Sequence, residues 1–266
     1  MKKVTLILFL IFLINAGTFS QTPEIYCKHF FYGYPTGTPA SNDMIIRDIY
    51  ALSSNDNTKF ADWVCYRLDK ETIGGNNKAP DRKWKADPWL DENETLEPDD
   101  YKNAPEKLGI DRGHQAPLAS FKGWESCYET NYLSNITPQN TELNRGLWKQ
   151  LEDKERKLTD TFDVIYVMTG PLYEKNMEKL PKADEPHKVP SAYWKIICIP
   201  VDKNRFEYAA FIFNQIVDKN GKLINHLVTI DEIEKRSGLN FLWILDDKIE
   251  NKIEKDNNIK WAIKIF

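Results

Sequence analysis

The chain has 266 residues and a formal net charge of −4, from 36 basic and 40 acidic side chains. Hydrophobic residues make up 41% and charged residues 29%, a balance that supplies a sizeable core and excludes disordered and fibrous classes. The excess of acid argues against a protein that coats nucleic acid or anionic membrane through its overall charge, but it leaves room for a local basic site.

The first residues have the three-part pattern of a secretory signal peptide. Two lysines follow the first methionine, residues 4–14 are almost wholly apolar, and small and polar residues come next. The apolar run is short for a transmembrane span, so an uncleaved anchor is the weaker alternative. We predict a signal peptide at 1–20, a secreted or periplasmic protein, and no stable membrane association after cleavage. The mature chain, 21–266, would carry a net charge of −6, because two of the 36 basic side chains are lost.

Export would place the cysteines in an oxidising compartment. The mature chain contains four of them, Cys27, Cys65, Cys127 and Cys198. An even number in an exported protein favours at least one disulfide bond over four buried thiols, and three pairings are open. No CxxC motif or Cys/His cluster indicates a zinc site.

Along the chain, a polar stretch at residues 70–110 is broken by glycines and prolines. Within it, Asp91–Asp100 holds six acids and no base. We expect this segment to be a solvated surface loop that faces away from any anionic substrate. Runs rich in β-branched and aromatic residues predict strands at Trp63–Leu68, Val164–Thr169, Trp194–Pro200 and Tyr208–Asn214.

Two helices are well marked. Thr141 is the expected N-cap of a helix that continues to about Leu158, with an apolar stripe at Leu143, Leu147 and Leu151. Thr229 is the expected N-cap of a second helix, Ile230–Arg236, which Gly238 would end. Because strands and helices are mixed and no strong boundary divides them, we predict one α+β domain.

The chemically informative segment is Asp111–Ser120. Arg112 and His114 lie two residues apart, so on a strand both side chains face the same way, and Gly113 allows another group to approach the backbone. Histidine is suited to take a proton near neutral pH, and the arginine fork binds phosphate through two hydrogen bonds. We expect a second strand at Asn131–Gln139.

The helix after that strand offers oxygen ligands. In a uniform helix Asn144, in the first turn, and Glu152, eight residues later, lie about 80° apart. One amide and one carboxylate form a thin protein shell, which suits a hydrated hard cation such as Mg²⁺ that keeps its waters and also binds phosphate. The two strands and this helix would form a compact β-β-α unit.

Several further motifs accompany this unit in a fixed order. The matching stretches are Tyr66-Arg67, Asp87-Pro88, Asp111–His114, Ser134–Gln139, Leu143–Trp148, Met168–Tyr173, Val189–Lys195 and Asp231–Leu239. Over roughly residues 60–245 they resemble the DNA/RNA non-specific endonucleases, the ββα-metal or His-Me-finger nucleases of the secreted bacterial nuclease and endonuclease G type. The resemblance implies an α+β fold in which a ββα-metal core is set in a central, mainly antiparallel sheet with flanking helices.

The resemblance also assigns a base and a metal site. His114 would be the general base that activates the attacking water. Asn144 would be the direct protein ligand of a hydrated Mg²⁺, with Mn²⁺ as an alternative. Glu152 would hold waters bound to that cation.

Phosphate binding would fall to two arginines. Arg112 and Arg67 would bind the phosphate and stabilise the charge that develops in the transition state, and Asn135 would orient the site near His114. The implied reaction is hydrolysis of DNA and RNA by a secreted endonuclease, leaving 5′-phosphate ends. With an ordinary histidine pKa of about 6.5, we expect activity to fall below about pH 6 as His114 is protonated.

Other interpretations of these residues, and of the function of the protein, remain open. Glu152 could simply pair with Arg156 one turn later, and Arg67 could be a structural strand arginine. Two other functional classes are a cysteine hydrolase that uses Cys127 with His114, and a non-catalytic nucleic-acid-binding or adhesion module on the same fold. Thiol alkylation would abolish the first activity, whereas loss of plasmid integrity that depends on metal would exclude the second.

Overall fold

The computed structural model describes residues 23–74, 82–202, 205–218 and 220–266. The predicted signal peptide, 1–20, lies outside these residues. Within them, no helix has both the length and the apolar character needed to cross a membrane.

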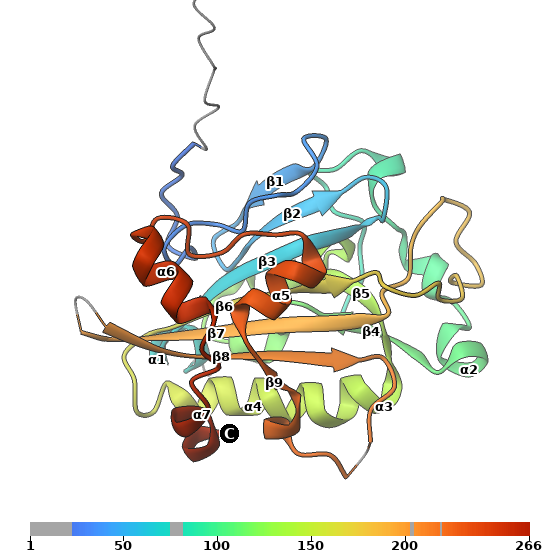
Figure 1. Ribbon diagram of the computed structural model, residues 1–266. Coiled ribbons are helices and arrows are strands. Elements are labelled where there is room, and N and C mark those ends of the chain that lie inside the picture. Colours follow the sequence, from blue (N-terminus) through green and yellow to red (C-terminus); the bar gives the residue numbers. More distant parts are fainter. Residues whose placement is uncertain (1–22, 75–81, 203–204, 219) are drawn as a thin grey trace, which may run out of the picture.

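A seven-stranded sheet forms the centre of the molecule, and all its neighbouring strands are antiparallel (Figure 1). The strands, in spatial order, are β1 (Asp43–Ile46), β2 (Ala51–Asn55), β3 (Phe60–Leu68), β6 (Ile165–Leu172), β7 (Ala192–Asp202), β8 (Arg205–Asn214) and β9 (Leu227–Val228). The four strands predicted from β-branched and aromatic runs correspond to β3, β6, β7 and β8, so those predictions are confirmed.

A separate two-stranded sheet carries the histidine motif. Strand β4 (Ile110–His114) pairs antiparallel with β5 (Ile136–Asn140), and His114 lies opposite Ile136. The strand predicted from Asn131 onward is wrong over its first half, because 3₁₀ turns at Glu125–Asn131 and Leu133–Asn135 precede β5. These turns bring the end of the loop back toward β4.

The helix after β5 is broken at Gly146. The short helix α3 (Thr141–Leu143) leads into a π-type turn, Asn144–Trp148, and then into α4 (Lys149–Leu158). The N-cap is Asn140 rather than Thr141, since its side-chain oxygen accepts from the backbone N–H of Glu142. Gly146 has φ −101° and ψ −112°, outside the helical region. The prediction of a uniform helix is therefore wrong, and the angle of about 80° expected between Asn144 and Glu152 does not apply.

Helices cover both faces of the large sheet. On one face, Trp148 and Leu151 pack in one cluster with Tyr66 of β3 and Phe211 of β8. On the other face, Ile233 of α5 (Ile230–Ser237) packs with side chains of β7. In Figure 1, α5 and α6 lie in front of the strands, and α4 runs below them. The remaining helices are α1 (Lys70–Ile73), α2 (Ala104–Leu108), α6 (Asp247–Glu254) and α7 (Ile259–Ile265).

Both predicted ends of α5 are confirmed. The Thr229 hydroxyl accepts from the backbone N–H of Glu232, and Gly238 follows the helix with a φ of 76°, which favours glycine. The mixed architecture, with one large antiparallel sheet, a separate β4–β5 pair and flanking helices, confirms the predicted α+β fold.

The four cysteines form no disulfide bond. All of them lie in described residues, and all are free thiols. Cys65 and Cys198 are on β3 and β7, with β6 between them, so their backbones lie about 10 Å apart, too far for a bridge. Cys127 belongs to the cluster on the α4 face, whereas Cys27 packs with Cys65 and Cys198 on the other. The prediction of at least one disulfide bond is therefore wrong for this structure.

Candidate active site

Strand β4 presents Arg112 and His114 on one side of the small sheet. Both side chains are partly exposed, whereas Asp111 and Gly113 are buried. A Cβ atom on Gly113 would lie 2.6 Å from Cβ of Gln139 on β5, so only glycine allows the two strands to come this close. The predicted common face of Arg112 and His114 is confirmed.

The imidazole of His114 is held by Asn131. Nε2 of His114 lies 3.0 Å from Oδ1 of Asn131. Because an amide oxygen can only accept, Nε2 must carry the proton, which leaves a lone pair on Nδ1. Burial lowers the pKa of His114 to about 4; the hydrogen bond to Asn131 opposes this change and the charge of Arg82 adds to it. His114 therefore stays neutral well below the pH expected from its ordinary pKa.

Asn135 acts on the backbone rather than on His114 itself. It is fully buried, accepts from the backbone N–H of Ala116 at 2.8 Å, and donates to the carbonyl oxygens of Ala116 and Thr130 at 3.0 and 2.9 Å. These bonds tie the turn after His114 to the segment that carries Asn131. The sequence did not identify Asn131, because a contact between residues 17 apart across two turns leaves no spacing pattern.

Arg112 is held by the acidic segment. Its guanidinium donates to the carbonyl oxygen of Pro98 at 2.6 Å and lies 5.1 Å from the ring centre of Tyr101 and 5.6 Å from that of Trp84. The expectation that Asp91–Asp100 faces away from the site is therefore wrong. Tyr101 is almost fully buried, and burial of this ring brings the segment onto β4.

Arg67 lies apart from the other predicted residues. It is on β3, pairs with Asp69 and lines a small cavity with His29 and Trp124. Its neighbour Tyr66 packs toward α4, so the alternation of the strand turns Arg67 away from that helix. Within the described residues, no hydrogen bond, ion pair or ring contact joins Arg67 to the other predicted site residues.

A different basic segment, Arg82–Lys85, lies beside His114. The ring centre of Trp84 is 5.3 Å from that of His114, and the charge of Arg82 acts on the imidazole. The carbonyl of Lys85 accepts from the backbone N–H of Leu133 at 2.9 Å, which fixes the segment next to the turn after Asn131. Arg82 was not identified from the sequence; basic residues alternating with a tryptophan are the signal that could have indicated it.

Asn144 is oriented by Asp111 of β4. Its Nδ2 donates to Oδ2 of Asp111 at 3.0 Å, and Arg145 donates to both oxygens of the same carboxylate at 2.8 Å each. Burial raises the pKa of Asp111, but the bonds from Arg145 and Asn144 outweigh it and hold that pKa below its ordinary value. The carboxylate thus stays ionised, and the amide oxygen of Asn144 is turned away from it.

Within the described part of the chain, Glu152 makes no hydrogen bond or ion pair. Arg156, one turn later, pairs with Asp153 and donates to Oγ of Ser120 at 3.2 Å, so the structural alternative of a Glu152–Arg156 pair is not formed. Burial raises the pKa of Glu152 to about 7, and the charge of Lys195 opposes that rise. The carboxylate remains available for groups outside the chain.

By their chemistry, Asn144 and Glu152 suit a divalent cation. Asn144 supplies a neutral amide oxygen whose NH₂ group is already engaged, and Glu152 supplies an unpaired carboxylate. Two oxygen donors leave most of a six-ligand shell to water and phosphate, as Mg²⁺ prefers.

The cysteine alternative finds no support at Cys127. The thiol is buried in the hydrophobic cluster on the α4 face, and burial raises its pKa. A nucleophilic cysteine needs the opposite change, a lowered pKa and access to substrate.

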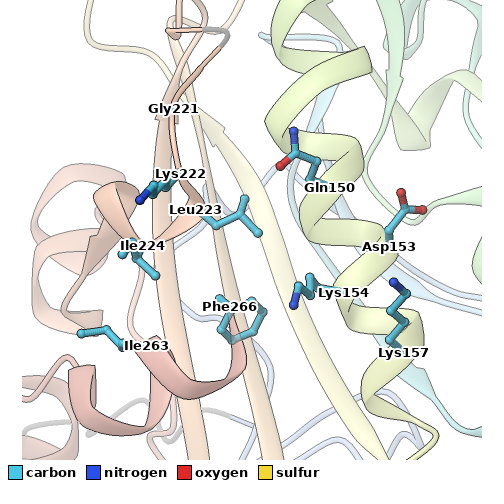
Figure 2. Close-up of a pocket in the computed structure, with 10 residues that line it drawn as sticks. All are labelled: Gln150, Asp153, Lys154, Lys157, Gly221, Lys222, Leu223, Ile224, Ile263 and Phe266. Atoms are coloured by element: carbon cyan, nitrogen blue, oxygen red, sulfur yellow. The ribbon is translucent and has the colours of Figure 1, made fainter.

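A cavity of about 480 Å³ lies on the other side of α4 (Figure 2). It is lined by Gln150, Asp153, Lys154, Lys157, Gly221, Lys222, Leu223, Ile224, Ile263 and Phe266. None of the candidate site residues is among them. At about 100° per residue, these α4 positions lie on the helix side opposite Glu152. The cavity is therefore separate from the candidate active site.

Comparisons with known proteins identify the family of the chain and proteins of similar sequence and fold. The model of the family described as DNA/RNA non-specific endonuclease matches residues 30–248. The chain is 47% identical over 225 residues to a nuclease of Serratia marcescens, covering 84% of this chain and 83% of that protein. It is 29% identical over 216 residues to mitochondrial endonuclease G of Homo sapiens, covering 77% and 71%. The solved structure titled "Crystal structure of the EndoG/EndoGI complex: Mechanism of EndoG inhibition" matches with a TM-score of 0.70 and 26% identity, covering 82% of this chain and 91% of that one.

Proposed function

The chain belongs to the DNA/RNA non-specific endonuclease family and is a metal-dependent nucleic-acid hydrolase, and we propose how it acts. It is an exported, Mg²⁺-dependent endonuclease that cleaves DNA and RNA, with His114 as general base, and leaves 5′-phosphate ends. The observation that carries the proposal is the hydrogen bond that Nε2 of His114 donates to Oδ1 of Asn131, which leaves Nδ1 able to accept a proton.

His114 takes a proton from the attacking water. Nδ1 accepts that proton, and the positive charge that results on the ring is stabilised through the Nε2–H bond to Asn131. Asn135 fixes the turn on which both partners depend, through its three bonds to the backbone of Ala116 and Thr130. It is a positioning residue and does not touch the reacting atoms.

Arg112 and Arg82 bind the phosphate. Arg112 stands two residues before His114 on β4, and the charge of Arg82 acts on the same imidazole. Both cations thus lie where the charge of a phosphodiester would grow in the transition state. We assign the second phosphate contact to Arg82 in place of Arg67, whose partner is Asp69.

Asn144 would hold the cation directly, and Glu152 would hold it through water. A bound Mg²⁺, or Mn²⁺ in its place, would offset the phosphate charge and stabilise the leaving 3′ oxygen. Asp111 keeps the amide of Asn144 in one orientation, so the ligand oxygen needs no rearrangement when the cation binds.

Export would depend on residues 1–20, and residues 21–266 would form one nuclease domain. Both remain predictions. Amino-terminal sequencing of protein recovered from the periplasm or the medium tests them: a chain that starts near Gln21 supports export, and a chain that keeps Met1 contradicts it.

The proposed activity is tested with supercoiled plasmid and a defined RNA. We expect both to be degraded with Mg²⁺ and to stay intact with EDTA. Fragments should accept a labelled phosphate at the 5′ end only after phosphatase treatment. Intact substrates with Mg²⁺, or fragments with free 5′ hydroxyls, would contradict the proposal.

A further inference from the structure

A fully buried ion pair lies between α4 and the large sheet. Nζ of Lys195 on β7 is 2.9 Å from Oε1 of Glu155 on α4, and both side chains are 0% exposed. The hydroxyl of Tyr66 on β3 donates to the other oxygen of Glu155 at 2.8 Å and accepts from Lys195 at 3.3 Å. Nζ of Lys195 also lies 4.3 Å from the ring centre of Trp148. We call these four side chains the Lys195 cluster.

Stability alone does not account for the Lys195 cluster. Two charges lose their hydration when they are buried, and an apolar pair of the same size is often as stable or more so. The ion pair and the hydroxyl add a preferred orientation of α4 on the sheet. Polar contacts between buried groups depend on orientation, so they fix the rotation of a helix in a way that apolar contacts do not. Here a hydrogen bond from Tyr66 of β3 and an ion pair with Lys195 of β7 meet at one position on α4, and Lys195 also donates to the Tyr66 hydroxyl.

The break at Gly146 makes this direction important. Asn144 lies before the break and is fixed to β4 through Asp111, whereas Glu152 lies after it. The two donors are therefore not held at a fixed angle by one continuous helix. The position of Glu152 relative to Asn144 depends on how α4 rests on the sheet. Lys195 contacts the chain on both sides of Glu152, at Trp148, the residue just before α4, and at Glu155 on α4.

We propose that Lys195, acting through Glu155, is a positioning residue that sets Glu152 in line with Asn144 and thereby determines the affinity of the site for its divalent cation. The inference rests on the proposed function. The Lys195 side chain is fully buried between α4 and the sheet, and in this proposal it acts by fixing the rotation of α4.

The test uses the full-length mature protein and three variants. The double variant Lys195→Met/Glu155→Leu removes both charges and leaves none unpaired, so it should unfold at a denaturant concentration at or above that of the wild type. Tyr66→Phe keeps the ion pair and removes both hydrogen bonds of the hydroxyl, the one to Glu155 and the one from Lys195. Ile196→Ala is the matched control, because its side chain packs on the opposite face of the same strand.

Binding of Mn²⁺ without substrate is measured by the disappearance of the free-ion signal in electron paramagnetic resonance. We expect the dissociation constant to rise at least about tenfold in the double variant and to rise less in Tyr66→Phe. Ile196→Ala should lower stability and leave Mn²⁺ binding unchanged. The kcat for plasmid cleavage at limiting Mn²⁺ should fall in the same order.

Wild-type Mn²⁺ affinity in a stable double variant would overturn the inference, because a merely structural pair is replaced without loss. If the double variant does not fold, unchanged Mn²⁺ affinity in Tyr66→Phe would also overturn the inference. Failure of the wild type itself to bind Mn²⁺ or to cleave plasmid would overturn the proposed function instead.

Discussion

Nε2 of His114 and Oδ1 of Asn131 lie 3.0 Å apart, and this contact decides which nitrogen of the histidine is basic. The amide oxygen accepts a hydrogen bond from Nε2, so the lone pair is on Nδ1. In the proposed mechanism Asn131 is thus coupled to the reaction, although it stands 17 residues from His114 in the sequence.

Asn131→Ala should lower kcat about tenfold to a hundredfold, because the ring loses the bond that selects its tautomer. Asn131→Asp keeps an acceptor and adds a negative charge, which favours the imidazolium form and raises the pKa of His114. Its rate should therefore fall at a higher pH than that of the wild type. Profiles of kcat/KM against pH check this, and identical profiles for all three proteins would disprove the role of Asn131.

The acid limit of activity should depend on the Mg²⁺ concentration. Burial lowers the pKa of His114 to about 4, so at saturating Mg²⁺ the base stays neutral and the rate should hold down to about pH 5. This revises the fall below about pH 6 that an ordinary histidine predicts. A fall centred near pH 6 at saturating Mg²⁺ would show that the histidine is not shielded in the way described.

At limiting Mg²⁺, protonation of Glu152 should lower the apparent affinity for the cation. Burial raises the pKa of Glu152 to about 7 without a cation, so below that pH the carboxylate holds a proton that the cation must displace. The Mg²⁺ concentration for half-maximal rate should rise by up to about tenfold per pH unit below pH 7. Glu152→Gln should lose this pH dependence, and titrations of the wild type that are the same at pH 5 and pH 8 would contradict the prediction.

Replacing Arg82 should reduce the catalytic efficiency far more than replacing Arg67. Arg82→Ala should reduce kcat/KM by about 10² to 10³, since it removes a cation next to the developing charge. Arg67→Ala should change kcat/KM by less than about threefold, because it removes a partly exposed pair with Asp69. Steady-state kinetics on a short duplex separate the two, and the opposite order of effects would restore Arg67 as the phosphate ligand.

Replacing Asp111 should lower the affinity for the cation more than replacing Arg145, its charged partner. Asp111→Ala removes the acceptor that holds Nδ2 of Asn144, and we expect cation affinity to fall about tenfold. Arg145 is largely exposed, so Arg145→Ala should change affinity little. Calorimetric titration with Mn²⁺ measures both; equal losses would mean that the charge of the pair, and not the bond to Asn144, supports the site.

Much of the fold follows from local pattern. The β-branched and aromatic runs of β3, β6, β7 and β8 and the capped helix α5 were predictable because their signals are local and consistent. The break at Gly146 was not, because a single glycine is also tolerated within a helix. The second strand was predicted too long, because over a few residues a 3₁₀ turn such as Leu133–Asn135 can have the same side chains as a strand.

The site was predictable only where its residues stand on regular elements. His114 and Arg112 have the expected strand spacing on β4, and Asn144, although its helix breaks at Gly146, is joined to the same strand through Asp111. Asn131 and Arg82 come from loops that return to β4 through tertiary contacts, which no periodicity encodes. The same limit applies to the acidic segment, whose hold on Arg112 depends on the burial of Tyr101 rather than on its charge.

The most direct test of the account compares the wild type with His114→Ala on supercoiled plasmid and RNA at one saturating Mg²⁺ concentration and pH 8. Circular dichroism first establishes that both proteins are folded. Loss of a general base should slow cleavage of both substrates by about 10² to 10⁴. Equal rates of cleavage by the two proteins would show that His114 is not the base and would contradict the mechanism.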